Sequence, residues 1–314
     1  MPMCRSLSRL RKRRRSVTDL RLQDIAKHGG DDALGLTVLS EEQLKKLHGV
    51  LLEILDDIQT ICDEHGLRYI LIGGSAIGAL RSGGIIPWDD DIDIAMPRAD
   101  FETFAKIVRE RYPEKYAMLH PQDKNNYGRV IPKIRLKGTE YRTILEQDLD
   151  ECGVFIDIYT IENLPDNAIA RYFQGAMTMG LGFALACRRL YKGRKWFRQL
   201  TGGASFYVKC AVGFCLSFAS YETWARWTDH WHSRCKDENS AFVSIPADCR
   251  HYFGEMQPRH VLCDRKAVPF EGRTSYVPQE ADSYLRDIYG DYMQIPPVEK
   301  QERNCYLTYD LGGR

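Results

Sequence analysis

Four aspartates fall within five residues in the first third of the chain, in the run Asp89-Asp90-Asp91-Ile92-Asp93. Because side chains alternate between the two faces of a strand, Asp91 and Asp93 would share one face, with the isoleucines on the other. Such a strand would present a carboxylate pair above an apolar core. Carboxylate oxygens are the ligands that Mg²⁺ prefers. The pattern favours a site for Mg²⁺ (or Mn²⁺) over the solvated loop or weak calcium site that acidic runs often form.

The residues just before the acidic run are typical of phosphate binding. Residues 68–72 predict a short buried strand, and Gly73-Gly74-Ser75 predicts a turn in which backbone approaches a ligand closely. Residues 76–81 predict a helix whose first N–H groups would face a phosphate. Ser75 stands where a helix N-cap is expected, so its hydroxyl could serve the helix, a phosphate, or both. A Gly-Gly-Ser sequence alone would be an ordinary turn.

A further aspartate interrupts an apolar segment, residues 153–159. A strand of this composition would be central in a sheet, where a lone carboxylate is costly unless it pairs with a metal or a cation. Taken alone, Asp157 could also be a strand-end aspartate bonded to backbone. In company with Asp91 and Asp93, it is predicted to be the third metal ligand. Three basic residues are candidates for phosphate contacts: Arg81, Lys133 and Arg135.

Hydrophobic spacing locates the elements that would hold these residues. A long helix is predicted to begin at Ser40, where Gln43 completes a capping box, and to end at Gly66. Its apolar stripe would pack behind the first strand. Residues 97–111 predict a second amphipathic helix. Short strands are predicted over residues 116–119 and 130–136.

The order strand, Gly-Gly-Ser, helix, turn and Asp-x-Asp is that of the nucleotidyltransferase fold. Residues 73–104, GGSAIGALRSGGIIPWDDDIDIAMPRADFETF, resemble the LicD family, which includes bacterial phosphocholine transferases and the fukutin-related phosphotransferases. The sequences VPFEG, IYGDYM and Pro296-Pro297 are again similar to that family, so the resemblance spans roughly Glu41 to Pro297. We therefore predict an α+β fold, with a nucleotidyltransferase-like mixed sheet, flanking helices and a basic helical insertion lobe.

The resemblance implies transfer from a CDP-activated donor to a hydroxyl, with CMP leaving. The donor would be CDP-choline in the bacterial branch and CDP-ribitol in the fukutin-related branch. The acceptor would be a glycan or a lipid-linked saccharide precursor. The predicted ligands of the catalytic metal are Asp91, Asp93 and Asp157, and Asp89 and Asp90 would tune the site from beside them. The predicted contacts to the donor phosphates are Gly73, Gly74, Ser75, Arg81 and Lys133.

Choline is modestly preferred as the transferred alcohol, because a quaternary ammonium binds aromatic faces. The candidate aromatic residues are Trp88, Tyr159, Tyr289 and Tyr292. Two rival functions stay open. One is a nucleotidylyltransferase that uses NTP and releases pyrophosphate, and the other is a metal- or nucleotide-binding protein without turnover.

The 314 residues divide by composition into four predicted parts. Residues 1–39 are a basic tail, predicted to be disordered, which could contact anionic lipid or nucleic acid or have no specific role. Residues 40–165 form the catalytic core, and residues 235–314 complete it. Residues 166–234 form a basic helical insertion, interpreted either as a face that lies on anionic membrane or as an ordinary helical lobe, and neither of its apolar segments is a convincing transmembrane span.

The location of the protein is predicted from its cysteines and from the start of the chain. Ten scattered cysteines, with no Cys-x-x-Cys pair, indicate reduced thiols. The first residues lack the apolar run of a secretory signal, and the Golgi anchor of the fukutin-related branch has no counterpart. We therefore expect a cytoplasmic bacterial enzyme, in peripheral contact with the inner face of the membrane, and no nucleic-acid partner.

Overall fold

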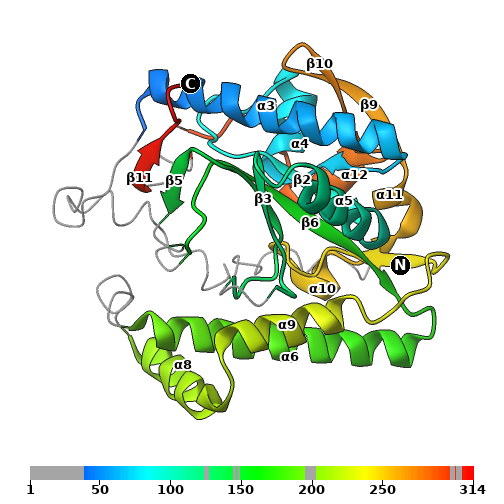
Figure 1. The fold of residues 1–314 in the computed structure, drawn as a ribbon. Coiled ribbons are helices and arrows are strands. Elements are labelled where there is room, and N and C mark those ends of the chain that lie inside the picture. Colours follow the sequence, from blue (N-terminus) through cyan, green and yellow to red (C-terminus); the bar gives the residue numbers. More distant parts are fainter. Residues whose placement is uncertain are drawn as a thin grey trace.

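The protein has the predicted α+β architecture, in which helices cover a mixed sheet (Figure 1). The computed structural model describes residues 39–123, 127–143, 146, 149–194, 203–297, 301 and 306–314. The predicted basic tail, apart from its last residue, lies outside the described residues. Nothing in the structure tests the predicted boundaries between the parts of the chain, which stay predictions.

The main sheet places the apolar strand with Asp157 at its centre, as predicted. Its strands follow the order β1, β2, β6, β4, β3, and β7 and β8 extend it from the far end of β6. Only the β2–β6 pairing is parallel. The bounds are β1 (Ile70–Leu71), β2 (Asp93–Pro97), β3 (Tyr116–Leu119), β4 (Lys133–Leu136), β6 (Phe155–Leu164), β7 (Phe242–Ser244) and β8 (Gln257–Pro258). β1 and β4 are therefore shorter than the predicted strands 68–72 and 130–136.

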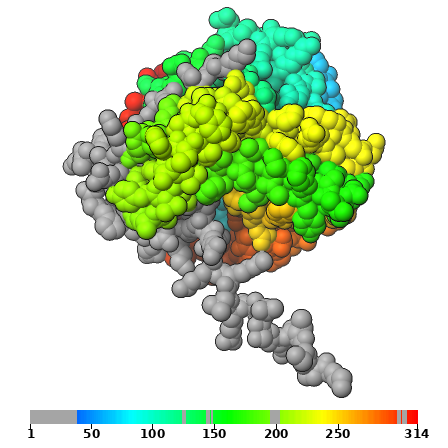
Figure 2. Space-filling model, turned by 90° about the horizontal axis from the view of Figure 1, so that it is seen from below, coloured from blue at the N-terminus to red at the C-terminus, as the bar shows by residue number. Residues whose placement is uncertain are grey.

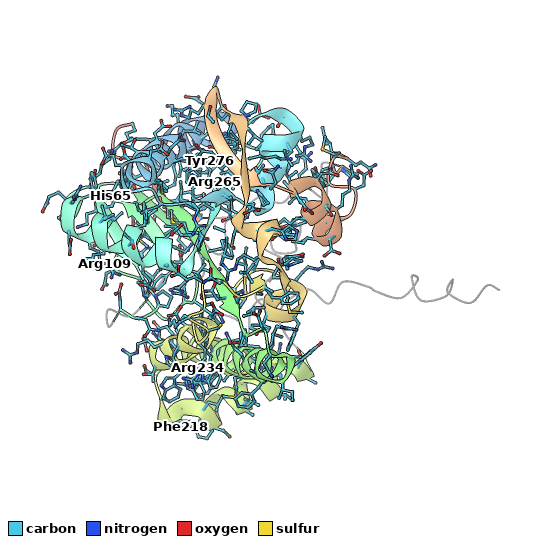
Figure 3. All side chains as sticks on the ribbon, turned by 90° about the vertical axis from the view of Figure 1, so that its right-hand side faces the viewer. His65, Arg109, Phe218, Arg234, Arg265 and Tyr276 are labelled. Carbon is cyan, nitrogen blue, oxygen red and sulfur yellow. The ribbon has the colours of Figure 1, made fainter. Side chains whose placement is uncertain are left out.

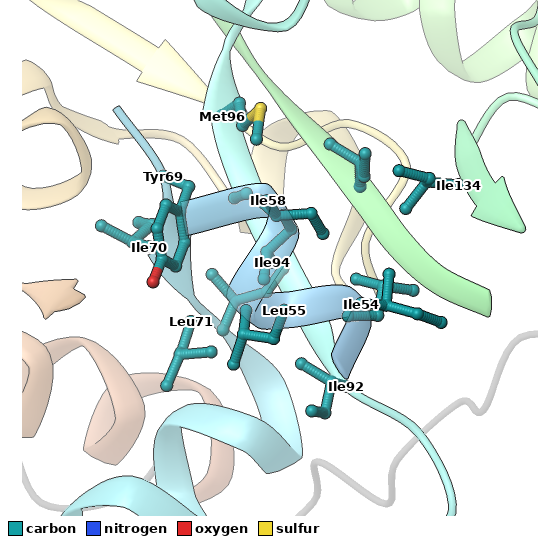
Figure 4. Packing of buried hydrophobic residues seen from close by; sticks show 14 of the residues in the cluster. Ile54, Leu55, Ile58, Tyr69, Ile70, Leu71, Ile92, Ile94, Met96 and Ile134 are labelled. Carbon is teal, nitrogen blue, oxygen red and sulfur yellow. The ribbon is translucent and has the colours of Figure 1, made fainter. Parts of the chain in front are cut away.

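Two helices pack on the apolar face of this sheet. The first is α3 (Glu41–His65), which begins with the predicted Ser40 capping box and ends at Gly66 in the left-handed conformation, at φ 66°. The second is α5 (Arg98–Arg111), which also contacts β2 and β6. Figure 4 shows α3 side chains of Ile54, Leu55 and Ile58 beside Ile92 and Ile94. Ile92 within the acidic run and Ile94 just after it are both fully buried, so the predicted core behind the carboxylates is confirmed.

A hairpin from the C-terminal part fixes the turn that precedes the acidic run. The hairpin consists of β9 (Arg265–Phe270) and β10 (Arg273–Pro278). At its tip, the Glu271 carboxylate accepts a hydrogen bond from the Ile85 N–H at 2.9 Å, and the Glu271 N–H donates to the Gly83 carbonyl at 2.8 Å. The neighbouring elements are α4 (Gly73–Ser82), α10 (His251–Gly254), α11 (Arg259–Cys263) and α12 (Ala281–Tyr289), and β11 (Tyr306–Asp310) pairs with β5 (Glu140–Thr143).

A helical lobe lies against one end of the sheet, at the bottom of Figure 1. It contains α6 (Ala168–Lys192), α8 (Ala204–Cys215), η2 (Leu216–Phe218) and α9 (Tyr221–His232). A buried ion-pair network joins it to the core, because the Arg98 guanidinium of α5 contacts both Glu162 of β6 and Asp229 of α9. Among the described helices, none alone has the length and apolar composition to cross a bilayer. Only Ala204–Phe218 and Tyr221–His232 taken together pass that test, with an 89° bend between them.

Candidate functional site

Three charged residues form a row across the middle of the sheet, one on each of three adjacent strands. Asp93 of β2 is the register partner of Asp157 of β6, and Asp157 is the register partner of Lys133 of β4. Paired residues point to the same face of a sheet, so the row lies on the face opposite the isoleucine core. The structure therefore brings the predicted residues Asp93 and Asp157 together.

The remaining aspartates of the run lie at the end of this row. Asp91 precedes β2 instead of belonging to it, because the strand begins only at Asp93. Carboxylate oxygens of Asp89, Asp90 and Asp91 lie within 4.8 Å of one another, an arrangement that could hold a metal ion. Asp90 is nearly buried, and its carboxylate accepts a hydrogen bond from the Tyr141 hydroxyl at 3.0 Å. Asp89 and Asp90 are thus arranged as possible metal ligands together with Asp91, whereas the sequence indicated that they only lie beside the ligands.

The carboxylates destabilise one another's charged forms. Burial, followed by repulsion from Asp91 and Asp157, raises the pKa of Asp93 well above its usual value. Burial, followed by repulsion from Asp91, does the same to the pKa of Asp89. The pKa values of Asp91 and Asp157 are also raised, chiefly by burial. A hard divalent cation with oxygen ligands would relieve this repulsion, so the donor set fits Mg²⁺ or Mn²⁺.

Lys133 provides a built-in positive charge at one end of the row. Its ammonium lies 2.5 Å from the Asp157 carboxylate, 3.6 Å from Glu146 and 3.4 Å from the centre of the Phe155 ring. Burial acts to raise the pKa of Glu146, but Lys133 and Arg135 outweigh it and lower the pKa to about 2. Glu146 is therefore an anion that holds both basic side chains in place. The predicted phosphate contacts of Lys133 and Arg135 stay predictions, because the structure shows these side chains bound to carboxylates.

The Gly-Gly-Ser sequence lies against the carboxylates, but not in the predicted way. Helix α4 begins at Gly73 instead of Ala76, and its N-cap is Ile72, so the predicted N-cap role of Ser75 is wrong. Ser75 lies in the first turn of α4 with its side chain buried, and its hydroxyl accepts a hydrogen bond from the Asp93 N–H at 2.9 Å. Ser75 thus fixes the backbone at the start of β2.

Both glycines of this sequence are disfavoured sites for a side chain, Gly73 because of its backbone conformation and Gly74 because of its close neighbour. Gly73 has φ 54°, which favours glycine, and a Cβ there would lie 3.5 Å from the Asp93 carboxylate. A Cβ at Gly74 would lie 2.5 Å from the Asp89 carboxylate, closer than real Cβ contacts. The first turn of α4 therefore faces the acidic site directly. A helix N-terminus at this position suits a negatively charged ligand held beside a metal.

The remaining predicted residues have other partners. The Arg81 guanidinium, in the last turn of α4, donates a hydrogen bond to the Tyr292 carbonyl at 3.3 Å and lies 5.6 Å from the centre of the Trp88 ring. Trp88 thus already binds a cation. Tyr289 lies nearer to the carboxylates, since its hydroxyl is 3.7 Å from the position of a Gly73 Cβ. Burial, then repulsion from Asp93 and Asp157, raises the pKa of Tyr159, which indicates that this phenol also borders the site.

Sequence reasoning missed a second group of side chains beside the site whose spacing could hold a metal ion. Ligand atoms of Asp248, Cys249 and Glu255 lie within 4.8 Å of one another. Asp248 contributes to the raised pKa of Asp93 and, after burial, is the main neighbour that raises the pKa of Tyr289. The segment before α10 that carries Asp248 has no motif that would have identified it, and only the packed structure brings it to the carboxylate row.

Comparison with known proteins confirms the predicted resemblance. Residues 66–163 match the family described as LicD/FKTN/FKRP, nucleotidyltransferase domain. The chain is 26% identical over 268 residues to the lipopolysaccharide cholinephosphotransferase LicD of Haemophilus influenzae, covering 84% of this chain and 94% of that protein. A stretch of 36 residues is 50% identical to the human ribitol 5-phosphate transferase FKRP, covering 12% of this chain and 7% of that protein. An uncharacterized protein of Rickettsia prowazekii is 35% identical over 68 residues, 26% of its length.

Proposed function

We propose that the protein transfers phosphocholine, or a related phospho-alcohol, from a CDP-activated donor to a hydroxyl of a cell-surface glycan or lipid-linked saccharide precursor, and releases CMP. The observation that carries the proposal is the in-register row of Asp93, Asp157 and Lys133, with the first turn of α4 packed against it. The similarity to the cholinephosphotransferase over most of both chains supports the class of reaction.

A divalent cation is part of the proposal, with Asp91, Asp93 and Asp157 as its ligands and Asp89 beside them. When bound, Mg²⁺ or Mn²⁺ would offset phosphate charge and lower the pKa of a coordinated hydroxyl. Catalysis of phosphoryl transfer depends mainly on positioning the reactants and on neutralising their charge. Ser75 supplies positioning, because its hydrogen bond fixes the Asp93 backbone. Lys133 holds the Asp157 carboxylate in one orientation.

The alcohol carried by the donor is the finer part of the proposal. Choline would need aromatic faces, and Tyr159 and Tyr289 border the carboxylates. Trp88 contributes less to this argument than the sequence suggested, because Arg81 lies over its ring. We favour choline on the strength of the two tyrosines and of the similarity to the bacterial enzyme. We also propose that the reaction occurs on the cytoplasmic side of the membrane.

The test is product analysis with purified protein, Mg²⁺ and a crude glycan extract. CDP-choline, CDP-ribitol and each NTP are supplied separately, and CMP and pyrophosphate are measured. Metal-dependent CMP release with a CDP-alcohol is the expected result. Asp93→Asn should abolish it, whereas Asp287→Asn, which alters an exposed ion pair with Arg250, should not. Pyrophosphate release would replace the proposal with nucleotidyl transfer, and absence of turnover with every donor would favour a binding protein.

A further inference from the structure

Helix α6 exposes an apolar stripe to solvent between residues 169 and 183. Ile169 is 82% exposed, and Tyr172, Phe173, Met179 and Phe183 are also exposed. With 100° between successive residues of a helix, these five side chains fall within an arc of about 120°. The opposite side of α6 is buried. A helix that only completes a core would hide this stripe.

Helix α8 and η2 continue the apolar surface. Phe218 is 75% exposed, and Tyr207, Val208 and Phe214 are each more than half exposed. The only charged residue of α8 is Lys209. Helix α8 packs closely on α6, since a Cβ at Gly213 would lie 2.3 Å from the Cys187 carbonyl of α6. Figure 2 shows α6 and α8 together on one face of the molecule, and Figure 3 places Phe218 at the end remote from Arg265 and Tyr276.

This concentration of apolar side chains is specific to the lobe. Among the residues that the structure describes, the large hydrophobic side chains that are exposed lie in α6, α8, η2 and α9, with three exceptions. One of the three, Phe253, stacks on Tyr172 at a centroid distance of 5.6 Å and so extends the same surface. The other two are Met293 and Ile295 near the C-terminal end. Scattered exposed apolar residues are normal, but a contiguous patch indicates an interaction surface.

The charge of the lobe indicates which partner fits this surface. Residues 166–234 contain ten Lys and Arg against three Asp and Glu. One of the three acids, Asp229, is buried in the ion pair with Arg98, which leaves Asp166 and Glu222. Exposed Phe, Tyr and Trp side chains combined with an excess of cations are typical of helices that lie in the interface of an anionic bilayer. A basic protein partner would be repelled, and a nucleic acid would not need the apolar stripe.

We propose that the lobe face, defined as the exposed apolar residues of α6, α8 and η2, docks on the surface of an anionic lipid bilayer. The helices lie in the interface and do not span it, consistent with the absence of a described single helix that could cross. Docking does not depend on turnover and can be measured separately from it. It would bring the catalytic core to acceptors that are themselves held in the membrane.

The test is flotation of the full chain with vesicles of phosphatidylcholine containing about 30% phosphatidylglycerol, compared with phosphatidylcholine alone. Wild-type protein should float with anionic vesicles and less so as salt rises. The double substitution Val208→Ser with Phe218→Ser should lower the partition coefficient about tenfold or more, since two exposed apolar anchors are lost. Ile169→Ser tests α6 independently. The matched control is Ile295→Ser, because Ile295 is 63% exposed but outside the lobe, and its partitioning should change less than twofold.

Two further measurements distinguish docking through the lobe face from binding through the N-terminal tail and from self-association. Replacing the basic residues 11–15 by Gln tests the N-terminal tail. Binding that disappears in the tail variant but persists in the Val208/Phe218 variant overturns the proposal. Sedimentation of the wild type tests for a second copy on the same face. A dimer that the lobe substitutions dissociate, without wild-type binding to anionic vesicles, also overturns it. Thermal melts of each variant confirm that the fold is retained.

Discussion

Neutralising either of two register partners should change the stability of the metal-free protein in opposite directions. Asp93 and Asp157 lie side by side on β2 and β6, and both have raised pKa values. Their neighbours differ. Carboxylates are the neighbours that act most strongly on Asp93, whereas Asp157 contacts the ammonium of Lys133. We expect Asp93→Asn to stabilise the metal-free protein, because it removes repulsion. Asp157→Asn relieves the burial of one carboxylate, but it leaves the nearly buried ammonium of Lys133 with a weaker partner, and we expect that cost to dominate, so this variant should be destabilised.

The magnitudes follow from the spacings. Adjacent strands are about 4.8 Å apart, which gives about 3 kcal/mol of repulsion between unit charges at an effective dielectric constant of about 20. Hydrogen bonding and partial solvation offset much of this repulsion, so a gain of about 1 kcal/mol is expected from removing the Asp93 charge. The Asp157–Lys133 contact at 2.5 Å corresponds to about 7 kcal/mol before desolvation is subtracted. Glu146 still neutralises Lys133 from 3.6 Å, so we expect a net loss of about 1–3 kcal/mol.

The assay is thermal unfolding in EDTA and again in excess Mg²⁺. A chain of this size shifts its melting temperature by about 2–4 °C per kcal/mol, so both effects are measurable. Wild type should gain about 3 kcal/mol from Mg²⁺ at a hundred times the dissociation constant, and both variants should lose most of that gain. Asp287→Asn is the surface control. The interpretation is refuted if Asp93→Asn destabilises the metal-free protein, or if either variant keeps the full Mg²⁺ response.

Three further predictions concern single contacts. Gly74→Ala should lower turnover at least about tenfold, because the new Cβ displaces the Asp89 carboxylate. Gly180→Ala is the control, since a Cβ at Gly180 would meet nothing within 4 Å. Equal activity of the two variants would contradict the prediction. Ser75→Ala should cost about 1–2 kcal/mol in chemical unfolding, since the first N–H of β2 loses its acceptor; an unchanged midpoint would argue against that role. Burial lowers the pKa of His232 from 6.5 to about 4. As pH falls from 6.5 to 4, the unfolded chain binds a proton at His232 that the folded chain does not bind, so up to about 3 kcal/mol of the stability present above pH 6.5 is lost. His232→Gln should remove that component of the pH dependence, and an identical pH profile would contradict the prediction.

Local signals in the sequence were sufficient for the elements that carry the site. The capping box at Ser40 and the glycine after the helix are contacts between residues a few positions apart, so α3 could be predicted at both ends. The alternation of aspartate and isoleucine predicted that Ile92 and Ile94 are buried, although the strand itself begins only at Asp93, because such a pattern is a local property. The apolar composition around Asp157, which is also a local property of the sequence, predicted a central strand.

What the sequence did not reveal are contacts between distant segments. The pairing of Lys133 with Asp157 depends on the register of β4 against β6, which no local pattern encodes. Ser75 was predicted to cap a helix, but its hydroxyl instead accepts a hydrogen bond from the Asp93 N–H and supports the acidic strand. Asp248 reaches the site only through the packing of the C-terminal part. The LicD-like residues marked where the site is, but not how its charges are balanced.

The pair of hydrogen bonds at Glu271 affects the point during synthesis of the chain at which the acidic site can form. These bonds hold Gly83 and Ile85, residues that leave the ribosome almost 190 positions earlier. The hairpin also covers the edge strand β1, and Arg273 pairs with Asp56 of α3. A nascent chain that has not yet reached β10 therefore lacks the contacts that position the acidic turn. We expect the isolated segment 66–163 not to fold, and catalytic competence to arise only when synthesis is nearly finished.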